Sequence, residues 1–267
     1  MNSTLIHPSA VIDPTAQLGR NVRVGPGAVI EAGCVIGDDC EIRAHAIITG
    51  AARLGVGNQI GYSAVVGAEP QDLGYKGAPT RVVIGDRNIL RELVTIHRGT
   101  KEGTETVIGN DNFLMTGAHV AHNCHIGNHV IIVNNVLLAG HVEIQDRAFL
   151  GGGSVVHQFT RVGELAIMRG LTRISKDVPP YFMAVDTNRV GGVNRVGMKR
   201  AGFSPEVRRS VVEAFKLLHR STLNFPQALE QLEKESPTPE VQKIITFIRT
   251  SKRGICAGSR RDTEDEE

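Results

Sequence analysis

The chain has 267 residues, with 30 lysines and arginines against 28 acidic residues, and is 41% hydrophobic but only 4% aromatic. This length allows one or two domains with a large core, and the near balance of charge argues against a nucleic-acid-binding or polybasic membrane protein. No stretch approaches the roughly 20 apolar residues that span a bilayer, the N-terminus lacks a secretory signal, and the four cysteines have no zinc-finger spacing. We therefore expect a reduced, soluble, cytoplasmic protein.

The first two thirds of the chain repeat with a period of six. Between positions 6 and 174, 26 of the 29 multiples of six are aliphatic residues or methionine, where the composition would give about 12. Neither the helical period of 3.6 nor the strand period of 2 fits this pattern. A short strand and a corner every six residues describe one face of a triangular coil, and 18-residue coils stack to bury an aliphatic column. We predict a parallel β-helix of hexapeptide repeats over residues 1–176.

Glycines and two interruptions complete the pattern. A glycine often follows the inward residue, as Gly19 and Gly61 do, and we expect these glycines to turn the corners with positive φ. The three exceptions to the period, Asp72, Ala78 and Glu102, fall in polar stretches. These stretches predict loops at about 67–82 and 97–107, inserted as whole hexads because the phase resumes unchanged. Loops on a rigid scaffold tend to carry function.

After position 174 the pattern becomes helical. Ser204 followed by a proline is typical of an N-cap and first helical turn, and two shorter helices are expected near 226–235 and 238–251. We predict a C-terminal helical domain over 177–256. Residues 257–267, which end in a run of acidic side chains, are expected to form a disordered tail.

Histidines gather in the repeat region. Five of the ten lie between positions 119 and 141. An 18-residue coil places Gly140 directly below His122, with His141 beside it. If the second loop is a six-residue insertion, His97 falls in the same column as His157. Any one histidine could simply be tolerated on the outer face, but four along one edge of the prism form a candidate site.

A row of neutral imidazoles beside a glycine suggests acyl transfer. Imidazole can accept the proton of a hydroxyl near neutral pH, and a glycine N–H can bind the oxyanion of a tetrahedral intermediate. The sequence has no nucleophile elbow and no Ser-His-Asp order, which favours direct attack by the acceptor hydroxyl over an acyl-enzyme.

Seven motifs in order give the chain a close resemblance to a known family. They are GAEPQDLGY (67–75), IGDRNILRELVTIHRGT (84–100), AHVAHNCHIG (118–127), LAGHV (138–142), VHQF (156–159), DVPPY (177–181) and GMKRAGFS (197–204). Together they resemble the acyl-[acyl-carrier-protein]–UDP-N-acetylglucosamine O-acyltransferases, which open lipid A synthesis in Gram-negative bacteria. The resemblance covers about residues 5–254.

The resemblance implies a mainly β fold, a left-handed parallel β-helix followed by a small α-helical C-terminal domain. It implies that His122 is the general base, that the Gly140 N–H binds the oxyanion, and that Gly170 lies at the distal end of the acyl groove. Nine further residues are implied to contact or surround the substrates, the last two at the nucleotide and its phosphates: Gln71, Asp72, His97, His119, His141, His157, Gln158, Asn194 and Arg200.

The implied partners are an acyl carrier protein as 3-hydroxyacyl donor, UDP-N-acetylglucosamine as acceptor, and two further copies of the chain in a homotrimer. No cofactor, metal, nucleic acid or integral membrane association is expected. An open groove at Gly170 predicts a preference for acyl chains of about 12 to 14 carbons, because each buried methylene contributes about 0.8 kcal/mol. The alternative is that Gly170 is only a corner glycine with positive φ.

The chain departs from the family pattern at three positions. Many members have aspartate where this chain has Asn123, lysine where it has Gly74, and a second arginine where it has Ala201. The first departure bears on how the catalytic imidazole is oriented, and the other two bear on diphosphate binding.

Four alternatives remain open at this point. The acceptor could be a 3-amino analogue of the sugar. The chain could be the N-acyltransferase later in the same pathway, which normally has an extra N-terminal domain. It could be a zinc hydratase on the same fold, like the gamma-class carbonic anhydrases. It could also be a non-catalytic scaffold, which leaves the histidines unexplained.

Overall fold

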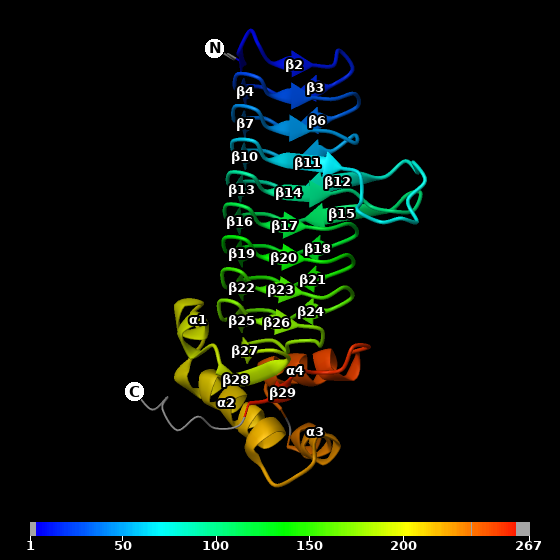
Figure 1. Cartoon of the computed structure of the whole chain (residues 1–267). Coiled ribbons are helices and arrows are strands. Elements are labelled where there is room, and N and C mark those ends of the chain that lie inside the picture. Colours follow the sequence, from blue (N-terminus) through cyan, green and yellow to red (C-terminus); the bar gives the residue numbers. More distant parts are fainter. Residues whose placement is uncertain (1–3, 236, 260–267) are drawn as a thin grey trace.

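The computed structural model describes residues 4–235 and 237–259. Within these residues, strands β1 to β26 form a long three-sided coil, and a small helical domain lies at its C-terminal end (Figure 1). Each turn of the coil contributes one strand to each of three parallel sheets, which we call sheets A, B and C. The predicted parallel β-helix is therefore present.

The strands are short, and most have two residues. The strands of sheet A are β1 (Leu5–Ile6), β4 (Arg23–Val24), β7 (Glu41–Ile42), β10 (Gln59–Ile60), β13 (Ile89–Leu90), β16 (Phe113–Leu114), β19 (Ile131–Ile132), β22 (Phe149–Leu150), β25 (Ile167–Met168), β27 (Phe182–Asp186), β28 (Arg189–Val193) and β29 (Ala257–Gly258). Those of sheet B are β2 (Val11–Ile12), β5 (Val29–Ile30), β8 (Ile47–Ile48), β11 (Val65–Ala68), β14 (Thr95–His97), β17 (His119–Val120), β20 (Leu137–Leu138), β23 (Val155–Val156) and β26 (Arg173–Ile174). Those of sheet C are β3 (Gln17–Leu18), β6 (Val35–Ile36), β9 (Arg53–Leu54), β12 (Arg81–Ile84), β15 (Glu105–Ile108), β18 (His125–Ile126), β21 (Glu143–Ile144) and β24 (Arg161–Val162).

The register between coils confirms the period and the two insertions. Residues one coil apart are normally 18 positions apart, as in the pair Leu5 and Arg23. The step lengthens to 30 between Gln59 and Ile89, and to 24 between Ile89 and Phe113. The chain therefore inserts two hexads between β11 and β12 and one hexad between β14 and β15. Both insertions project from the corner between sheets B and C (Figure 1).

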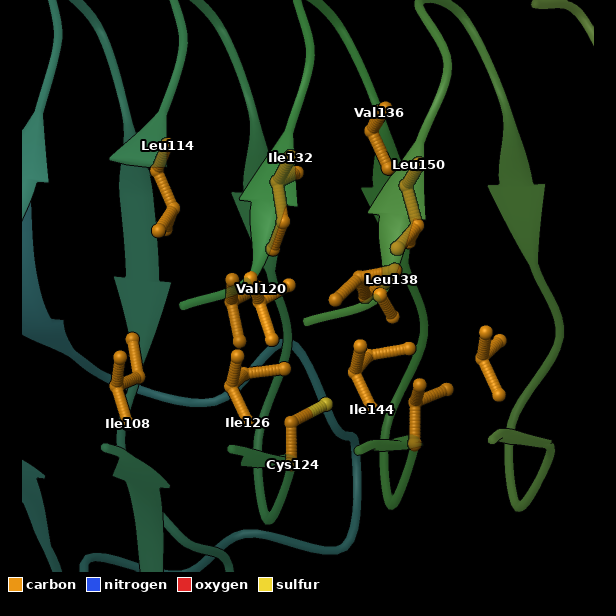
Figure 2. Close-up of a cluster of buried hydrophobic side chains, with 14 of the residues drawn as sticks. Ile108, Leu114, Val120, Cys124, Ile126, Ile132, Val136, Leu138, Ile144 and Leu150 are labelled. Carbon is orange, nitrogen blue, oxygen red and sulfur yellow. The ribbon is translucent and has the colours of Figure 1, made fainter. Parts of the chain in front are cut away.

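The inward aliphatic residues stack into columns inside the prism. Figure 2 shows Ile108, Ile126 and Ile144 from sheet C in one column, facing residues such as Leu114 from sheet A. Each of these four side chains is at most 3% exposed. In the first coil Ile6 is 47% exposed, because no further coil covers that end of the prism in the described part of the chain.

The corner glycines do not have the expected role. Positive φ occurs two residues later, at Asn21 (56°) and Ser63 (54°), and not at Gly19 or Gly61. Instead, a Cβ atom on Gly19 would lie 2.6 Å from the backbone nitrogen of Asp38 in the next coil. These glycines are needed because neighbouring backbones approach closely, and the prediction of positive φ was wrong.

The C-terminal domain continues the end of sheet A. Strand β27 pairs with β25 and forms an antiparallel hairpin with β28. The helices that follow are α1 (Arg195–Arg200), α2 (Pro205–Arg220), α3 (Phe225–Lys234) and α4 (Pro239–Arg249). Ser204 caps α2 as expected, since its side chain accepts a hydrogen bond from the N–H of Val207. None of the helices in the described residues is long and apolar enough to cross a membrane.

The ordered chain extends further than expected. Residues 257–258 form β29, which pairs with β28, so the predicted disordered tail does not begin at position 257. The backbone of Ala257 bonds to the carbonyl of Asn188, which fixes this segment to the sheet. Residues 260–267 of the predicted tail lie outside the described residues. Helix α1 and the β27–β28 hairpin were also not expected from the sequence.

Candidate active site

A groove with a volume of about 780 Å³ runs along sheet B, beside the corner from which the two loops project. Its apolar wall includes Leu137 and Val155, which are 45% and 37% exposed. Six of the predicted site residues line it: Gln71, His119, His122, Gly140, His157 and Gln158. The sequence therefore brought a polar cluster and an apolar surface to the same groove.

The predicted histidine columns follow from the register of sheet B. Thr95 pairs with His119, His119 with Leu137, and Leu137 with Val155. Two positions further along each strand, the same register puts His97 and His157 in one column, as the six-residue insertion predicted. His97 is only 8% exposed and does not line the groove. It lies behind His119, with 5.0 Å between the two ring centroids.

His122 lies against Gly140 of the next coil. A Cβ atom at position 140 would be 2.6 Å from Nε2 of His122, so any larger residue would displace the imidazole. The ring of His141 lies 5.3 Å from that of His122, edge to face. Within the described residues, no acceptor bonds to the N–H of Gly140. A base and an unused N–H donor thus meet at one place in the groove.

Asn123 sets the tautomer of His122. Its Oδ1 atom accepts a hydrogen bond from the hydroxyl of Thr100 (3.0 Å) and lies 3.0 Å from Nδ1 of His122. Because Oδ1 can only accept, Nδ1 of His122 carries the proton and Nε2 keeps its lone pair. Asn123 is 9% exposed and has a left-handed φ of 60°, which asparagine tolerates well. The amide therefore orients the ring without adding a negative charge.

The imidazoles around His122 are held neutral. Burial, followed by the neighbouring His119, lowers the pKa of His97 to about 4. Burial, followed by the proximity of His122, also lowers the pKa of His119 and His141. Neutral rings can donate one hydrogen bond and accept another, which suits them to binding hydroxyl and carbonyl groups.

The first loop contributes residues from outside the coil. Gln71 lines the groove. Asp72 does not line it, but its negative charge acts on His141, and its Oδ1 accepts the N–H of Gly74 at 2.7 Å. Arg98, on the second loop, bonds to the carbonyl of Gly67 and fixes the start of the first loop.

Three predicted site residues lie apart from the groove. Asn194 caps α1, accepting the N–H of Gly197 at 2.9 Å, and Arg200 ends that helix. In Figure 1, helix α1 lies near the C-terminal end of the prism, on the side opposite the projecting loops. Gly170 lies in the corner between β25 and β26 and does not line the groove.

The alternative explanation of Gly170 was wrong. The residue with positive φ at that corner is Leu171 (62°), and Gly170 itself has no positive φ. The nearest atom to a Cβ at position 170 would be the carbonyl oxygen of Gly152, at 3.4 Å. The backbone therefore does not require glycine at this position.

Sequence reasoning missed several residues of the site. Arg98 and Thr100 lie in a quoted motif, but only the structure shows what they contact. Arg173, Thr187 and Asn188 line the far end of the groove and belong to no motif. Within residues 4–235 and 237–259, no cluster of three or more histidine, cysteine or acidic side chains has the geometry to hold a metal ion.

Comparisons with known proteins show which families and solved structures the chain is similar to. A family model described as bacterial transferase hexapeptide (six repeats) matches residues 15–50 and 105–140, and one described as UDP-N-acetylglucosamine O-acyltransferase, domain 2, matches residues 177–256. The solved UDP-N-acetylglucosamine acyltransferase of Francisella novicida is 39% identical, with a TM-score of 0.91 over 96% of this chain and 95% of its own. That of Bacteroides fragilis is 43% identical, with the same TM-score over 94% and 99%.

These matches define the class of protein as a hexapeptide-repeat acyltransferase on a left-handed parallel β-helix, so the predicted fold class is confirmed. The acyl-[acyl-carrier-protein]–UDP-N-acetylglucosamine O-acyltransferase of Gloeothece citriformis is 48% identical over 251 residues, which are 93% of this chain and 91% of the relative. The chain belongs to this family of O-acyltransferases. Family membership sets aside the zinc hydratase, the N-acyltransferase and the scaffold.

Proposed function

We propose that the chain transfers a 3-hydroxyacyl group from acyl carrier protein to the 3-hydroxyl of UDP-N-acetylglucosamine, as the first step of lipid A biosynthesis. The observation that carries this proposal is the pairing of His122 with Gly140 in a groove that is apolar along one wall. A base without a nucleophilic side chain beside it fits direct attack by the acceptor. Both substrates belong to the cytoplasm, which is where we place the enzyme.

In this mechanism His122 is the general base. Its Nε2 atom takes the proton of the sugar 3-hydroxyl as the hydroxyl oxygen attacks the thioester carbonyl. The N–H of Gly140 binds the oxyanion of the tetrahedral intermediate. When the intermediate collapses, the C–S bond breaks and the thiol of the carrier protein leaves with the proton from His122. Asn123 keeps Nδ1 protonated throughout, so the base has the correct tautomer at the start of each cycle.

The remaining polar residues in and beside the groove bind the acceptor. Gln71 and Gln158 line the groove, Asp72 and His141 lie beside it, and together they offer both donors and acceptors to sugar hydroxyls. His119 and His157 complete this polar wall, and His97 packs against His119. The apolar side chains of Leu137 and Val155 suit an acyl chain, because their exposed surface is removed from water when the chain binds.

Residues for the nucleotide are proposed to come from a second copy. Asn194 and Arg200 lie on or next to α1, and no residue of this helix lines the groove of the same chain. A homotrimer with threefold symmetry would bring α1 of one copy to the groove of the next. The forked donors of Arg200 suit a diphosphate. Ala201 in place of a second arginine after Arg200, and Gly74 in place of a lysine, leave fewer cations for that diphosphate.

The direct test is an assay of the purified enzyme with defined substrates. UDP-N-acetylglucosamine and its 3-amino analogue are each incubated with carrier proteins bearing 3-hydroxyacyl chains of different lengths. We expect an alkali-labile ester on UDP-N-acetylglucosamine. A product formed only with the 3-amino analogue, as an alkali-stable amide, would overturn the choice of acceptor, and no product with either would overturn the proposed function.

A further inference from the structure

An arginine of the C-terminal segment reaches the wall of the groove. The Nη2 atom of Arg253 lies 3.3 Å from Nδ1 of His157, and its Nε donates to the carbonyl oxygen of Ser175 at 3.1 Å. His157 and Ser175 both line the groove. Arg253 is 96 positions from His157 in the sequence and belongs to none of the motifs that define the site.

The segment around Arg253 is firmly attached to the end of the prism. The N–H of Asp177 donates to the carbonyl of Gly254 at 2.8 Å, and the N–H of Cys256 donates to the carbonyl of Asp177 at 2.9 Å. The carboxylate of Asp177, which is 1% exposed, accepts a hydrogen bond from the hydroxyl of Ser251 at 2.7 Å. Backbone bonds after Arg253 and a side-chain bond before it therefore hold Arg253 beside the groove.

The chemistry of the two side chains fixes the tautomer of His157. A guanidinium group is always protonated and can only donate hydrogen bonds. Nδ1 of His157 must therefore be the acceptor, and the neutral ring carries its proton on Nε2. The carbonyl oxygen of Gln158 also lies 3.3 Å from Nδ1, but in this tautomer both atoms are acceptors and no hydrogen bond forms between them.

We propose that Arg253 is a positioning residue for acyl transfer, an inference that rests on the proposed function. It holds His157 in the tautomer whose Nε2–H donates a hydrogen bond to a hydroxyl or carbonyl oxygen of the substrates in the groove. A histidine free to exchange tautomers would present a lone pair to the same oxygen for part of the time. The C-terminal segment thereby contributes to the site through one side chain.

The first test is a double-mutant cycle on the purified full-length enzyme. We expect Arg253→Ala to lower kcat/KM about 10-fold, the order expected for one hydrogen bond with a charged partner. In the His157→Ala background the same substitution should change kcat/KM less than about 2-fold, because its effect passes through His157. Effects that multiply in the double variant would overturn the proposal. Lys252→Ala, which removes the neighbouring exposed cation, is the matched control and should behave like the wild type.

The second test reads the tautomer directly and needs no turnover. Histidine labelled with ¹⁵N in the ring distinguishes a protonated from an unprotonated Nδ1 by chemical shift. We expect His157 to be protonated on Nε2 in the wild type and to become a mixture in Arg253→Ala. Arg253→Gln keeps an N–H donor and should retain the wild-type signal. If Arg253→Ala does not fold, Arg253→Met, which keeps an aliphatic stem but has no donor, replaces it in both tests. A wild-type His157 protonated on Nδ1 would overturn the proposal.

The two proposals fail in different ways. A wild-type enzyme with no acyltransferase activity would count against the proposed function, and it would leave the ¹⁵N signal of His157 unchanged.

Discussion

The guanidinium group of Arg98 lies over the ring of Tyr75, 5.6 Å from the ring centroid, and its Nη2 atom also lies 3.1 Å from the hydroxyl of Tyr75. The same side chain donates to the carbonyl of Gly67 at 2.9 Å and pairs with Glu69 at 3.1 Å. A Cβ atom on Gly50 would lie 2.8 Å from Arg98, so a glycine provides the space that this side chain occupies.

Arg98 therefore fixes the loop that carries Gln71 and Asp72. We expect Arg98→Ala to raise the KM for UDP-N-acetylglucosamine about 10-fold and to change kcat less, because the loop is proposed to contact the acceptor and not the transferred carbon. Arg98→Lys should restore only part of the affinity, since an ammonium group cannot donate from a planar fork. Steady-state kinetics with varied acceptor measure this, and an unchanged KM in a folded Arg98→Ala variant would contradict it.

Removal of the imidazole of His122 should abolish acyl transfer. A general base contributes roughly 100- to 10,000-fold to the rate, so kcat of His122→Ala should fall by that factor while the thermal unfolding midpoint stays near the wild-type value. More than about a tenth of the wild-type kcat would exclude His122 as the base. His141→Ala should weaken activity chiefly through substrate binding.

Substitutions of Asn123 test how this residue supports His122 as the general base. Asn123→Ala removes the acceptor for Nδ1 of His122 and should lower kcat without changing the chemistry of the base. Asn123→Asp keeps the acceptor and adds a charge that favours the imidazolium form. As the pH is lowered, the Asn123→Asp variant should therefore lose activity at a higher pH than the wild type does.

Mixed trimers should regain activity that neither parent variant has. His122→Ala lacks the base and Arg200→Ala lacks the proposed phosphate contact from the neighbouring copy. In trimers formed from an equal mixture, about one site in four combines two intact halves, so about a quarter of the wild-type activity should return. The mixture is made by co-refolding, and each parent refolded alone is the control. An active enzyme that is monomeric by light scattering would contradict the shared site.

A side chain at position 170 should shorten the preferred acyl chain. The structure leaves room for a Cβ there, so Gly170→Met should fold. We expect the wild type to prefer chains of about 12 to 14 carbons over 10, by as much as roughly 200-fold in kcat/KM if four methylenes are buried. Gly170→Met should reverse this preference. Competition between long and short acyl donors measures the ratio, and an unchanged ratio in the folded variant would show that the bound acyl chain does not reach position 170.

Acid should destabilise the C-terminal domain through His219. This ring lies among Phe182, Phe215 and Phe225, with centroids 5.1 to 5.7 Å away. Burial, and then the positive charge of Arg220, lower its pKa to about 4. Between about pH 4 and 6.5 the unfolded chain thus binds more protons at His219 than the native state, so stability falls as the pH drops through this range.

The size of this effect can be measured by substitution. His219 should account for a loss of about 2 kcal/mol in the free energy of unfolding between pH 7 and pH 5. His219→Phe should remove that part of the loss, as measured by urea unfolding at both pH values. His45→Ala changes an exposed histidine and should leave the loss as in the wild type. An equal loss in His219→Phe and the wild type would contradict the assignment.

Periodicity made much of the fold and the site predictable. A strict six-residue spacing fixes which residues stack, so the contact between His122 and Gly140 and the shared column of His97 and His157 followed from counting. Contacts made by residues outside the six-residue repeat could not be predicted by counting positions. Arg253 reaches His157 through the path of the last residues of the chain, and the hairpin after position 181 depends on pairing with β25.

Buried asparagines in the coils that carry the two insertions have a consequence for how the loops can vary. Asn88 donates to the side-chain oxygen of Asn58 at 3.0 Å, and Asn112 donates to that of Asn88 at 2.9 Å. These pairs join the three coils between which the extra hexads leave the prism. Each amide satisfies its neighbour inside the coil and none bonds to the first loop, so the stacking of these coils is specified independently of what lies between them. Natural or engineered exchange of the first loop should thus leave the spacing of His119, His122 and His157 unchanged.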